Sequence, residues 1–335
     1  MTQSFDYKSA GVDIEAGENA VKNIKAAVRS TFTSGVLTDI GKFGGFFALD
    51  LSKYKNPVLV SSIDGVGTKL KVAFMMKRHD TVGEDLVNHC INDILVGGAC
   101  PLFFLDYIGT GILRSKDVES LVSGMVRGCK AAECALIGGE MAEMPGFYQA
   151  GEYDVAGCIV GIVEKDHVID GSRIQKNDVL IGLPSTGLHT NGYSLARKVL
   201  FDHAGYDVNT RVPGLECSVG EALIAVHRCY KPVFEALYGS IDIHGMSHIT
   251  GGGIEGNTRR ILPDGLSLSI QWESWKLPSI FRLIQEEGHV PEQDMHRTFN
   301  MGVGYIFIVP PDEESRCMEI LEMQGETPIR VGEVV

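Results

Sequence analysis

The most informative segment of the chain reads Val58-Leu59-Val60-Ser61-Ser62-Ile63-Asp64-Gly65-Val66-Gly67-Thr68-Lys69. Its first half is apolar, which predicts a strand, and its second half holds a carboxylate, two glycines and a lysine. A carboxylate at a strand end can bind a hard cation, and glycines let backbone N–H groups approach an anion. A plain Asp-Gly turn between a strand and a helix explains the same residues equally well. The chain contains no G-x-x-x-x-G-K-[ST] phosphate loop.

Strands and helices alternate irregularly on either side of this segment. The irregular order favours an α+β fold over a doubly wound sheet. The apolar pattern breaks around Asp170-Gly171-Ser172, which predicts two mixed α/β domains, 1–169 and 170–335, and the length also suggests about two domains. The expected helices are 20–28, 81–96, 116–132, 193–202, 220–237, 312–323 and one after Pro278, and the expected strands are 58–63, 102–108, 135–137, 155–163, 179–183, 246–249, 266–270, 303–309 and 329–331.

One expected helix, 81–96, carries an unusual polar face. At about 100° per residue, five polar side chains share one arc. An exposed helix face normally holds lysine, arginine and glutamate, whereas short Asp, Asn and His side chains are weak helix formers. The stripe therefore indicates a site, although a solvated face is the ordinary explanation of a polar stripe. Its members are Asp85, Asn88, His89, Asn92 and Asp93.

A third carboxylate follows a strand in the same half. Gly138-Gly139-Glu140 comes directly after the short apolar run 135–137. Together with Asp64 and Asp93, Glu140 makes three carboxylates at strand ends or on a helix face. Mg²⁺ binds a few carboxylates plus water and phosphate oxygens, so the set predicts a magnesium site beside nucleotide phosphates. The sequence alone does not place the three side chains in space.

Two loops of the second half could hold a phosphate. His189-Thr190-Asn191-Gly192 opens an expected helix, where free N–H groups bind anions; a simple helix cap is the alternative. Gly251-Gly252-Gly253-Ile254-Glu255-Gly256 matches G-x-G-x-x-G, with Glu273 at about the spacing of the dinucleotide fingerprint. Pro263-Asp264-Gly265 cuts the following helix short and no βαβ unit precedes it, so a triple-glycine turn explains the match better.

The composition excludes several classes of protein. Hydrophobic residues make up 44% of the chain and charged residues 22%, which is ordinary for a globular protein with a core. The net charge of -13 argues against broad binding to nucleic acid or to an anionic membrane. The eight cysteines form no C-x-x-C pair, as in reduced cytosolic proteins. Residues 1–6 do not resemble a secretory signal, and the longest apolar run, 94–105, is too short to span a membrane. We therefore expect a cytoplasmic protein.

The order of these motifs resembles one family nearly end to end. The chain is similar to the phosphoribosylformylglycinamidine cyclo-ligases, also called AIR synthetases, of purine biosynthesis. The departures are small: Met141 stands where the family usually has Thr, Thr190 where it often has Ser, and Gly256 where it often has Glu. The matching segments are 7–14, 64–69, 78–81, 90–93, 101–107, 138–140, 142–146, 191–194, 250–253, 297–300 and 302–304.

The resemblance implies an ATP-dependent ring closure. Formylglycinamidine ribonucleotide would become 5-aminoimidazole ribonucleotide, with release of ADP and phosphate. ATP would phosphorylate the formamide oxygen, and the amidine nitrogen would then close the imidazole ring. The resemblance also implies a homodimer whose N-terminal halves pair into a central β-barrel. Phosphoryl transfer depends mainly on positioning and charge stabilisation, which fits the carboxylates and glycines found from the residues alone.

Carried over residue by residue, the resemblance implies four groups of site residues. Asp64, Asp93 and Glu140 would bind Mg²⁺, and Asp64, Lys69, His89 and Asp93 would be catalytic. His89 would carry a proton, since histidine titrates near neutral pH, unless it is only a hydrogen-bonded structural residue. ATP would lie against Lys25, Gly65, Gly67, Thr68, Lys69, Gly138 and Gly139, and the ribonucleotide phosphate against His189, Asn191, Gly251, Gly252 and Gly253.

Three other functions stay open at this point. A selenophosphate-, thiamine-phosphate- or hydrogenase-maturation-type enzyme of the same superfamily would share the ATP half, although the chain lacks the redox-active N-terminal Cys of many selenophosphate enzymes. A dinucleotide-dependent oxidoreductase built on residues 251–256 would bind a nicotinamide cofactor. A non-catalytic binding module would follow if the carboxylates did not converge.

Overall fold

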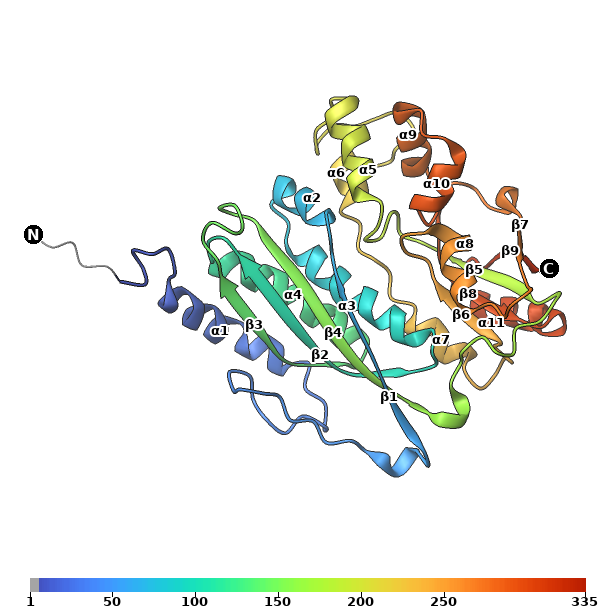
Figure 1. Cartoon of the computed structure of the whole chain (residues 1–335), viewed down its shortest axis with the longest axis horizontal. Helices are drawn as coiled ribbons and strands as arrows, with labels where there is room; N and C mark the ends of the chain where they lie inside the picture. Colours follow the sequence, from blue (N-terminus) through green and yellow to red (C-terminus); the bar gives the residue numbers. More distant parts are fainter. Residues whose placement is uncertain (1–5) are drawn as a thin grey trace, which may run out of the picture.

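A computed structural model describes residues 6–335 of the chain (Figure 1). The expectation that residues 1–6 are no secretory signal falls almost wholly on residues 1–5, which lie outside the described range. The helices are α1 (Ile14–Arg29), α2 (Lys69–Met76), α3 (Asp80–Leu95), α4 (Ser115–Ala131), α5 (Tyr193–Arg197), α6 (Val219–Leu223), α7 (Lys231–Leu237), α8 (Gly253–Thr258), α9 (Ser279–Gly288), α10 (Glu292–Thr298) and α11 (Glu314–Met323). The strands are β1 (Pro57–Gly65), β2 (Cys100–Thr110), β3 (Ala135–Glu143), β4 (Tyr153–Glu164), β5 (Val179–Pro184), β6 (Gly245–His248), β7 (Leu268–Ile270), β8 (Val303–Val309) and β9 (Ile329–Val334). The short helices are η1 (Leu51–Lys53), η2 (Lys165–His167), π-helical η3 (Lys198–His203), η4 (Arg259–Ile261), η5 (Trp272–Ser274) and η6 (Pro311–Glu313).

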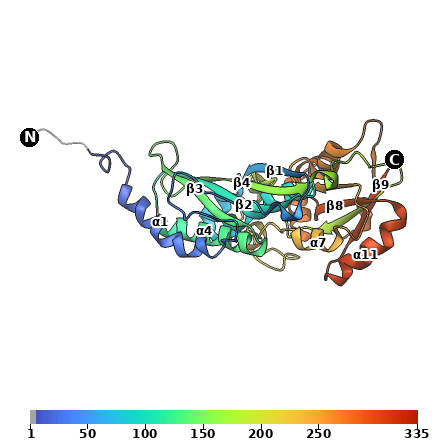
Figure 2. The ribbon, with the colours of Figure 1, turned by 90° about the horizontal axis from the view of Figure 1, so that it is seen from below.

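The first sheet has the strand order β1-β4-β2-β3. β4 is antiparallel to both of its neighbours, whereas β2 and β3 are parallel and α4 connects them. The helices α1, α3 and α4 lie on one face of this sheet (Figures 1 and 2). Along β1, Ser62 and Asp64 accordingly face α3, while Leu59 and Ile63 face away from it.

The second sheet has the order β6-β8-β5-β9-β7, and all neighbouring strands are antiparallel. Its central strand is β5, and the neighbouring β8 is a continuous apolar strand that is buried along its whole length. The two sheets with their helices confirm the expected mixture of strands and helices. Within the second sheet no parallel pair exists on which a dinucleotide-binding unit could be built. The division at residues 169 and 170, between β4 and β5, stays a prediction.

The helix α3 lies deep in the first half because it crosses α4 at two glycines. A Cβ atom on Gly83 would lie 1.9 Å from the carbonyl oxygen of Leu121, and one on Gly124 would lie 1.8 Å from that of Asp80. Only glycine permits backbones this close. As a result α3 is buried over most of its length, and its polar stripe is not a solvated face.

The expected helix 220–237 is wrong in its middle. The structure has two short helices, α6 and α7, joined by residues 224–230 in an irregular path. The side chain of Asn92 donates to the carbonyl oxygen of Arg228 at 2.8 Å and accepts from the N–H of Tyr230 at 2.9 Å. Backbone groups bonded in this way cannot also form the backbone hydrogen bonds of a continuous helix.

The strand β3 is longer than the expected strand 135–137. Gly138-Gly139-Glu140, expected to break the strand, lies inside it, with Gly139 opposite Asp106 of β2. A Cβ atom on Gly139 would lie 2.2 Å from the Oδ1 atom of Asp106. The glycine therefore leaves room for the neighbouring carboxyl group and does not form a turn.

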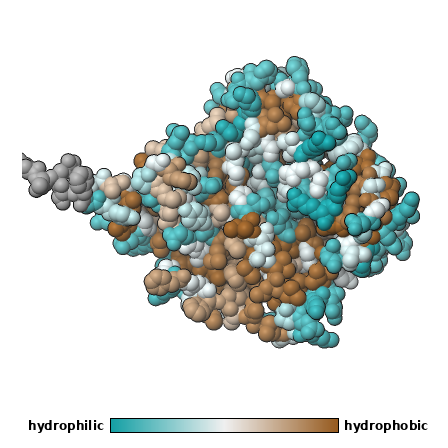
Figure 3. All heavy atoms as spheres, in the orientation of Figure 1, coloured by the Kyte–Doolittle hydropathy of each residue, from teal (hydrophilic) through white to brown (hydrophobic). Residues whose placement is uncertain are grey.

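The uncovered face of the first sheet is apolar. Leu59 and Ile63 of β1 are 56% and 72% exposed, and Tyr107 of β2 is 37% exposed. Figure 3 shows hydrophobic atoms gathered over these strands. Exposed apolar surface that is continuous over several strands marks an interaction surface. Within residues 6–335, no helix is long and apolar enough to cross a membrane.

Replacing Gly83 tests the crossing of α3 and α4. We expect Gly83→Ala to lower the free energy of unfolding by about 3 kcal/mol, because the added methyl group must push the two backbones apart. Gly17→Ala in α1 is the matched control. Its Cβ atom meets nothing within 4 Å, so the helix should gain about 0.5–1 kcal/mol. Urea unfolding of both variants measures the difference, and equal stabilities would contradict the close crossing.

Candidate functional site

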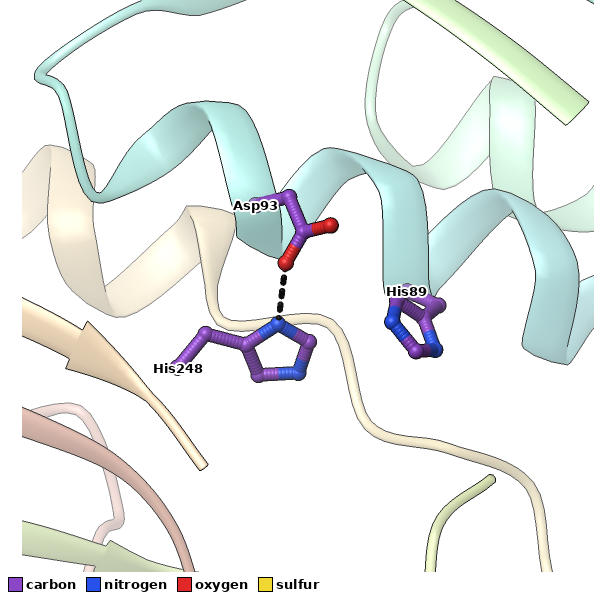
Figure 4. A group of neighbouring side chains, drawn as sticks. All are labelled: His89, Asp93 and His248. Carbon is purple, nitrogen blue, oxygen red and sulfur yellow. Dashed lines mark hydrogen bonds and ion pairs between the residues drawn. The ribbon is translucent and has the colours of Figure 1, made fainter. Parts of the chain in front are cut away.

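The candidate site lies where the two halves of the chain meet. Asp64 lies near the end of β1, and His89 and Asp93 lie on successive turns of α3. Thr190, from the loop before α5, and His248, at the end of β6, bond to them from the second half. Figure 4 shows His89, Asp93 and His248 pointing toward one another. The first half supplies two carboxylates and one histidine, and the second half supplies a hydroxyl group and another histidine. The site therefore forms only where the two halves meet.

His89 is bonded on both ring nitrogens. Its Nε2 atom lies 2.7 Å from Oδ2 of Asp64, and its Nδ1 atom lies 2.6 Å from the hydroxyl oxygen of Thr190. Burial lowers the pKa of the imidazole, but the hydrogen bond and charge of Asp64 and the charge of Asp93 outweigh it and leave the pKa raised. The arrangement fits a protonated ring that links the two halves.

Asp93 joins the halves in a similar way. Its Oδ1 atom accepts from Nδ1 of His248 at 2.8 Å, and its Oδ2 atom accepts from the hydroxyl of Ser62 at 3.1 Å. Burial raises the pKa of the carboxyl group, but the hydrogen bond and charge of His248 lower it by more, so the net pKa is below its ordinary value. The side chain is 28% exposed, so the carboxylate is charged and accessible.

His227 and His248 complete the cluster, and the sequence did not single out either of them. Nε2 of His227 lies 3.0 Å from Nε2 of His248, and the His227 ring stacks on His189 with centroids 4.0 Å apart. Burial and the neighbouring histidines hold the pKa of His189 and His227 well below the ordinary range, so both rings are neutral. His227 was hidden because residues 220–237 looked like one helix; the position of His248 at a strand end was the available signal.

These contacts form one hydrogen-bonded chain between two carboxylates. Each neutral ring has one donor nitrogen and one acceptor nitrogen, and a hydroxyl group has a single proton to donate. Nδ1 of His227 lies 3.3 Å from the Thr190 hydroxyl, which closes the path. These donors and acceptors decide which ring nitrogen of each neutral histidine carries its proton. The chain runs Asp93, His248, His227, Thr190, His89 and Asp64.

Two kinds of metal ion can be considered at the junction. Ligand atoms of His89, Asp93 and His248 lie within 4.8 Å of one another (Figure 4), and imidazoles suit transition metals. Mg²⁺ prefers oxygen ligands and keeps several waters. The carboxylates of Asp64 and Asp93 fit Mg²⁺, because both are part-exposed and hold a low pKa.

Glu140 does not join these carboxylates. Across the first sheet, Gly65 lies opposite Ala156, Ala156 opposite Tyr107, and Tyr107 opposite Glu140. Three strand spacings separate β1 from β3 at this level, or roughly 14 Å. Glu140 is also one position out of phase with Asp64 and faces away from α3. Within one chain, the predicted set of three carboxylates is therefore not assembled.

The sequence led us to expect that Lys69 faces an open phosphate site, but the structure places it elsewhere. Its side chain is fully buried, and its Nζ atom lies 2.7 Å from Oδ2 of Asp85 and donates to the carbonyl oxygen of Ala225 at 2.6 Å. Burial lowers the pKa of Lys69, and it raises the pKa of Asp85 to about 6 despite the opposing charge of the lysine. The ammonium group is therefore bonded within the junction and is not available to a phosphate.

The other nucleotide candidates fall into two groups. Gly65, Gly67 and Thr68 lie at the junction, where the Thr68 hydroxyl is 3.1 Å from that of Ser194. Gly67 has a φ of +63° and open space beside it. Gly138 and Gly139 lie in β3, against which α1 packs, and α1 carries Lys25. Lys25 forms an ion pair of 2.7 Å with Asp39.

The phosphate candidates of the second half come together. Oδ1 of Asn191 lies 3.1 Å from the position that a Cβ atom on Gly251 would take. The N–H groups of Gly252 and Gly253 already donate to the carbonyl oxygens of Arg297 and Thr250, at 3.0 and 3.2 Å, so they are not free for a phosphate.

His189 offers a free donor in the loop before α5. Its Nε2 atom accepts from the N–H of Thr186 at 3.1 Å, so Nδ1 carries the proton of the neutral ring. That Nδ1 atom is buried and has no partner among the described residues. A buried donor without a partner is costly unless a ligand or water accepts from it.

Known proteins match the chain over nearly its whole length. Residues 49–163 match the N-terminal domain, and residues 175–335 the C-terminal domain, of AIR synthase related proteins. The chain is 51% identical over 330 residues to phosphoribosylformylglycinamidine cyclo-ligase of Alkaliphilus metalliredigens (strain QYMF), covering 98% of this chain and 95% of that protein. It is 53% identical over 328 residues to the protein of the same name from Trichlorobacter lovleyi, covering 98% and 94%. The chain belongs to the phosphoribosylformylglycinamidine cyclo-ligase family.

Solved structures of other families share the fold of this cyclo-ligase family member. Thiamine-monophosphate kinase from Stenotrophomonas maltophilia K279a superimposes with a TM-score of 0.67 at 14% identity, covering 93% of each chain. A hydrogenase maturation protein in complex with ATP gives 0.66 at 16% identity, covering 95% of this chain and 86% of that one. At this level of identity the likeness concerns the fold alone. The resemblance found from the sequence is confirmed, whereas the thiamine-phosphate and hydrogenase-maturation proteins are only 14% and 16% identical.

Lys69 and Asp85 allow a test of the junction in this family member. We expect Lys69→Met to lower the free energy of unfolding by about 3–5 kcal/mol, because it leaves a buried carboxyl group without its cation. Adding Asp85→Leu to the same chain should recover part of the loss. Arg173→Gln, which breaks an exposed ion pair with Asp242, should cost less than about 1 kcal/mol. If urea unfolding finds Lys69→Met as stable as Arg173→Gln, the buried pair is not what joins the halves.

Proposed function

We propose that this chain catalyses the ATP-dependent cyclisation of formylglycinamidine ribonucleotide to 5-aminoimidazole ribonucleotide, with release of ADP and phosphate. The near-complete match to curated cyclo-ligases carries the proposal. The junction supports it, because it gathers charged carboxylates and neutral imidazoles suited to phosphoryl transfer and proton movement.

The reaction needs an activated oxygen and a nitrogen nucleophile that are both in the substrate. The formamide oxygen is a poor leaving group, so in our proposal ATP phosphorylates it and an imidoyl phosphate forms. The amidine nitrogen then bonds to the formyl carbon, the carbon–oxygen bond breaks, and phosphate leaves with that oxygen. The nitrogen loses a proton as the ring closes. The protein needs to align these atoms and neutralise charge, and no side-chain nucleophile is required.

Asp64 and Asp93 are our candidates for holding Mg²⁺. The ion would supply positive charge against the transferring phosphoryl group. Ser62 and His248 orient Asp93, and His89 orients Asp64, so both carboxylates are fixed before a ligand arrives. Glu140 does not join them within one chain and stays a separate candidate, as do Gly138, Gly139 and Lys25.

His89 remains the candidate proton carrier, because its ring is bonded to Asp64 on one side and to Thr190 on the other. His189 and Asn191 are the candidates for the ribonucleotide phosphate. The unpartnered Nδ1 donor of His189 suits a phosphate oxygen. Among the glycines of the turn 251–253, only Gly251 would contribute its N–H group. In this scheme the first half supplies the ATP site and the second half the ribonucleotide site.

Asp93 provides the direct test of this function. We expect Asp93→Asn to lower kcat for ring closure by about 100-fold or more, since a charge aimed at the reacting phosphoryl group is lost. The assay follows ADP release and imidazole formation with ATP, Mg²⁺ and formylglycinamidine ribonucleotide. Asp166→Asn, at an exposed position in η2, is the matched control and should leave kcat unchanged. Turnover by Asp93→Asn equal to that of the control at saturating ATP and Mg²⁺ would disprove the assignment.

The apolar face of the first sheet supports a homodimer. In our proposal two copies bring these faces together and close a β-barrel, which would cover Leu59, Ile63 and Tyr107.

All eight cysteines are free, in keeping with a reducing, cytoplasmic location.

A lysine on the apolar face should separate the two copies. We expect Ile63→Lys to convert a dimer to a monomer at micromolar concentrations, because a charge would be buried without a partner. Met323→Lys, equally exposed on α11 and away from this sheet, should stay dimeric. Sedimentation experiments measure both variants. A wild-type protein that is monomeric and fully active would refute the dimer.

A further inference from the structure

A cavity of about 300 Å³ lies in the second half of the chain. Its walls come from η5, α9, α10, the residues between them and Met301 after α10. It shares no residue with the hydrogen-bonded chain of the junction. Cavities of this volume hold small organic molecules. Both tryptophans of the chain, Trp272 and Trp275, line it.

The two indole rings are fixed in place before any ligand arrives. Trp272 stacks face to face on His296, with centroids 3.6 Å apart and ring planes at 4°. Trp275 donates its Nε1–H group to the carbonyl oxygen of Met301 at 2.9 Å. The indole centroids lie 5.6 Å from each other at 47°. A rigid aromatic wall costs little conformational entropy when a flat molecule binds to it.

Charged side chains at the same cavity are free to bind a ligand. Lys276 and Arg282 line it, and neither forms an ion pair within residues 6–335. Arginine binds phosphate through two parallel N–H groups, and lysine adds a point charge. Glu273 and Glu292 also line the cavity and can accept hydrogen bonds from amino groups. The lining thus combines an aromatic wall, two cations and two acceptors.

We propose that this cavity binds a nucleoside monophosphate, with its base against the indole pair and its phosphate at Lys276 and Arg282. The base would gain stacking, and its amino groups would meet Glu273 or Glu292. An organic cation would also be drawn to the indole rings and to the two carboxylates of the lining, so choline is the competing ligand in the test. This site is separate from the ATP and ribonucleotide sites proposed at the junction.

Tryptophan fluorescence reports directly on this cavity, because the chain has no tryptophan elsewhere. The whole protein is titrated with AMP, adenosine, inorganic phosphate and choline, without the ribonucleotide substrate. We expect AMP to change the emission saturably, and adenosine and phosphate to bind at least about tenfold more weakly, which corresponds to about 1.4 kcal/mol. No turnover is needed, so the result is independent of the proposed reaction.

Matched variants locate the ligand. Arg282→Gln combined with Lys276→Gln should weaken AMP about tenfold or more, while Arg260→Gln, exposed and outside the lining, should bind AMP like the wild type. Three outcomes would overturn the proposal: no saturable change with AMP, a stronger response to choline than to AMP, or unaltered AMP binding by the double variant. Thermal unfolding confirms that each variant is folded before its titration is compared.

Discussion

The buried backbone of residues 227–230 must have hydrogen-bond partners, and the whole junction depends on how they are supplied. A buried N–H or C=O group without a partner is costly. Asp85 accepts from the N–H of His227 at 2.6 Å, and Asn88 donates to its carbonyl oxygen at 2.8 Å. Asn92 bonds in the same way to the backbone of Arg228 and Tyr230. The polar stripe of α3 is thus a template for a segment of the other half.

This constraint also fixes the chemistry nearby. Because the stripe holds residues 227–230 against α3, the ring of His227 comes to lie 5.2 Å from that of His89 on this helix. His248, from β6, bonds both to His227 and to Asp93. Lys69 neutralises Asp85 and bonds to the carbonyl oxygen of Ala225, so a lysine beside a glycine-rich turn is part of the scaffold. On α3 the structural residues Asp85, Asn88 and Asn92 form one row, and the catalytic candidates His89 and Asp93 form a second row beside it; within each row neighbours are about one turn apart.

The sequence predicted those features that are encoded locally. Apolar periodicity located nearly every strand, and the unusual residue types of the α3 stripe correctly indicated that this face is not ordinary surface. Prediction failed where distant residues decide the local structure. Nothing near residues 224–230 reveals that Asn92 competes for their backbone. The place of Glu140 depends on the register of four strands, and the burial of Lys69 depends on a carboxyl group of another helix.

The template on α3 has a consequence for how such proteins can be recombined. Each half carries one side of a set of specific hydrogen bonds, and the partner of each bond lies in the other half. A chimera made by joining the first half of one relative to the second half of another would keep both sheets intact. It would align the histidines correctly only if the stripe and the segment that it holds were inherited from the same parent. The two halves are therefore bound to change together.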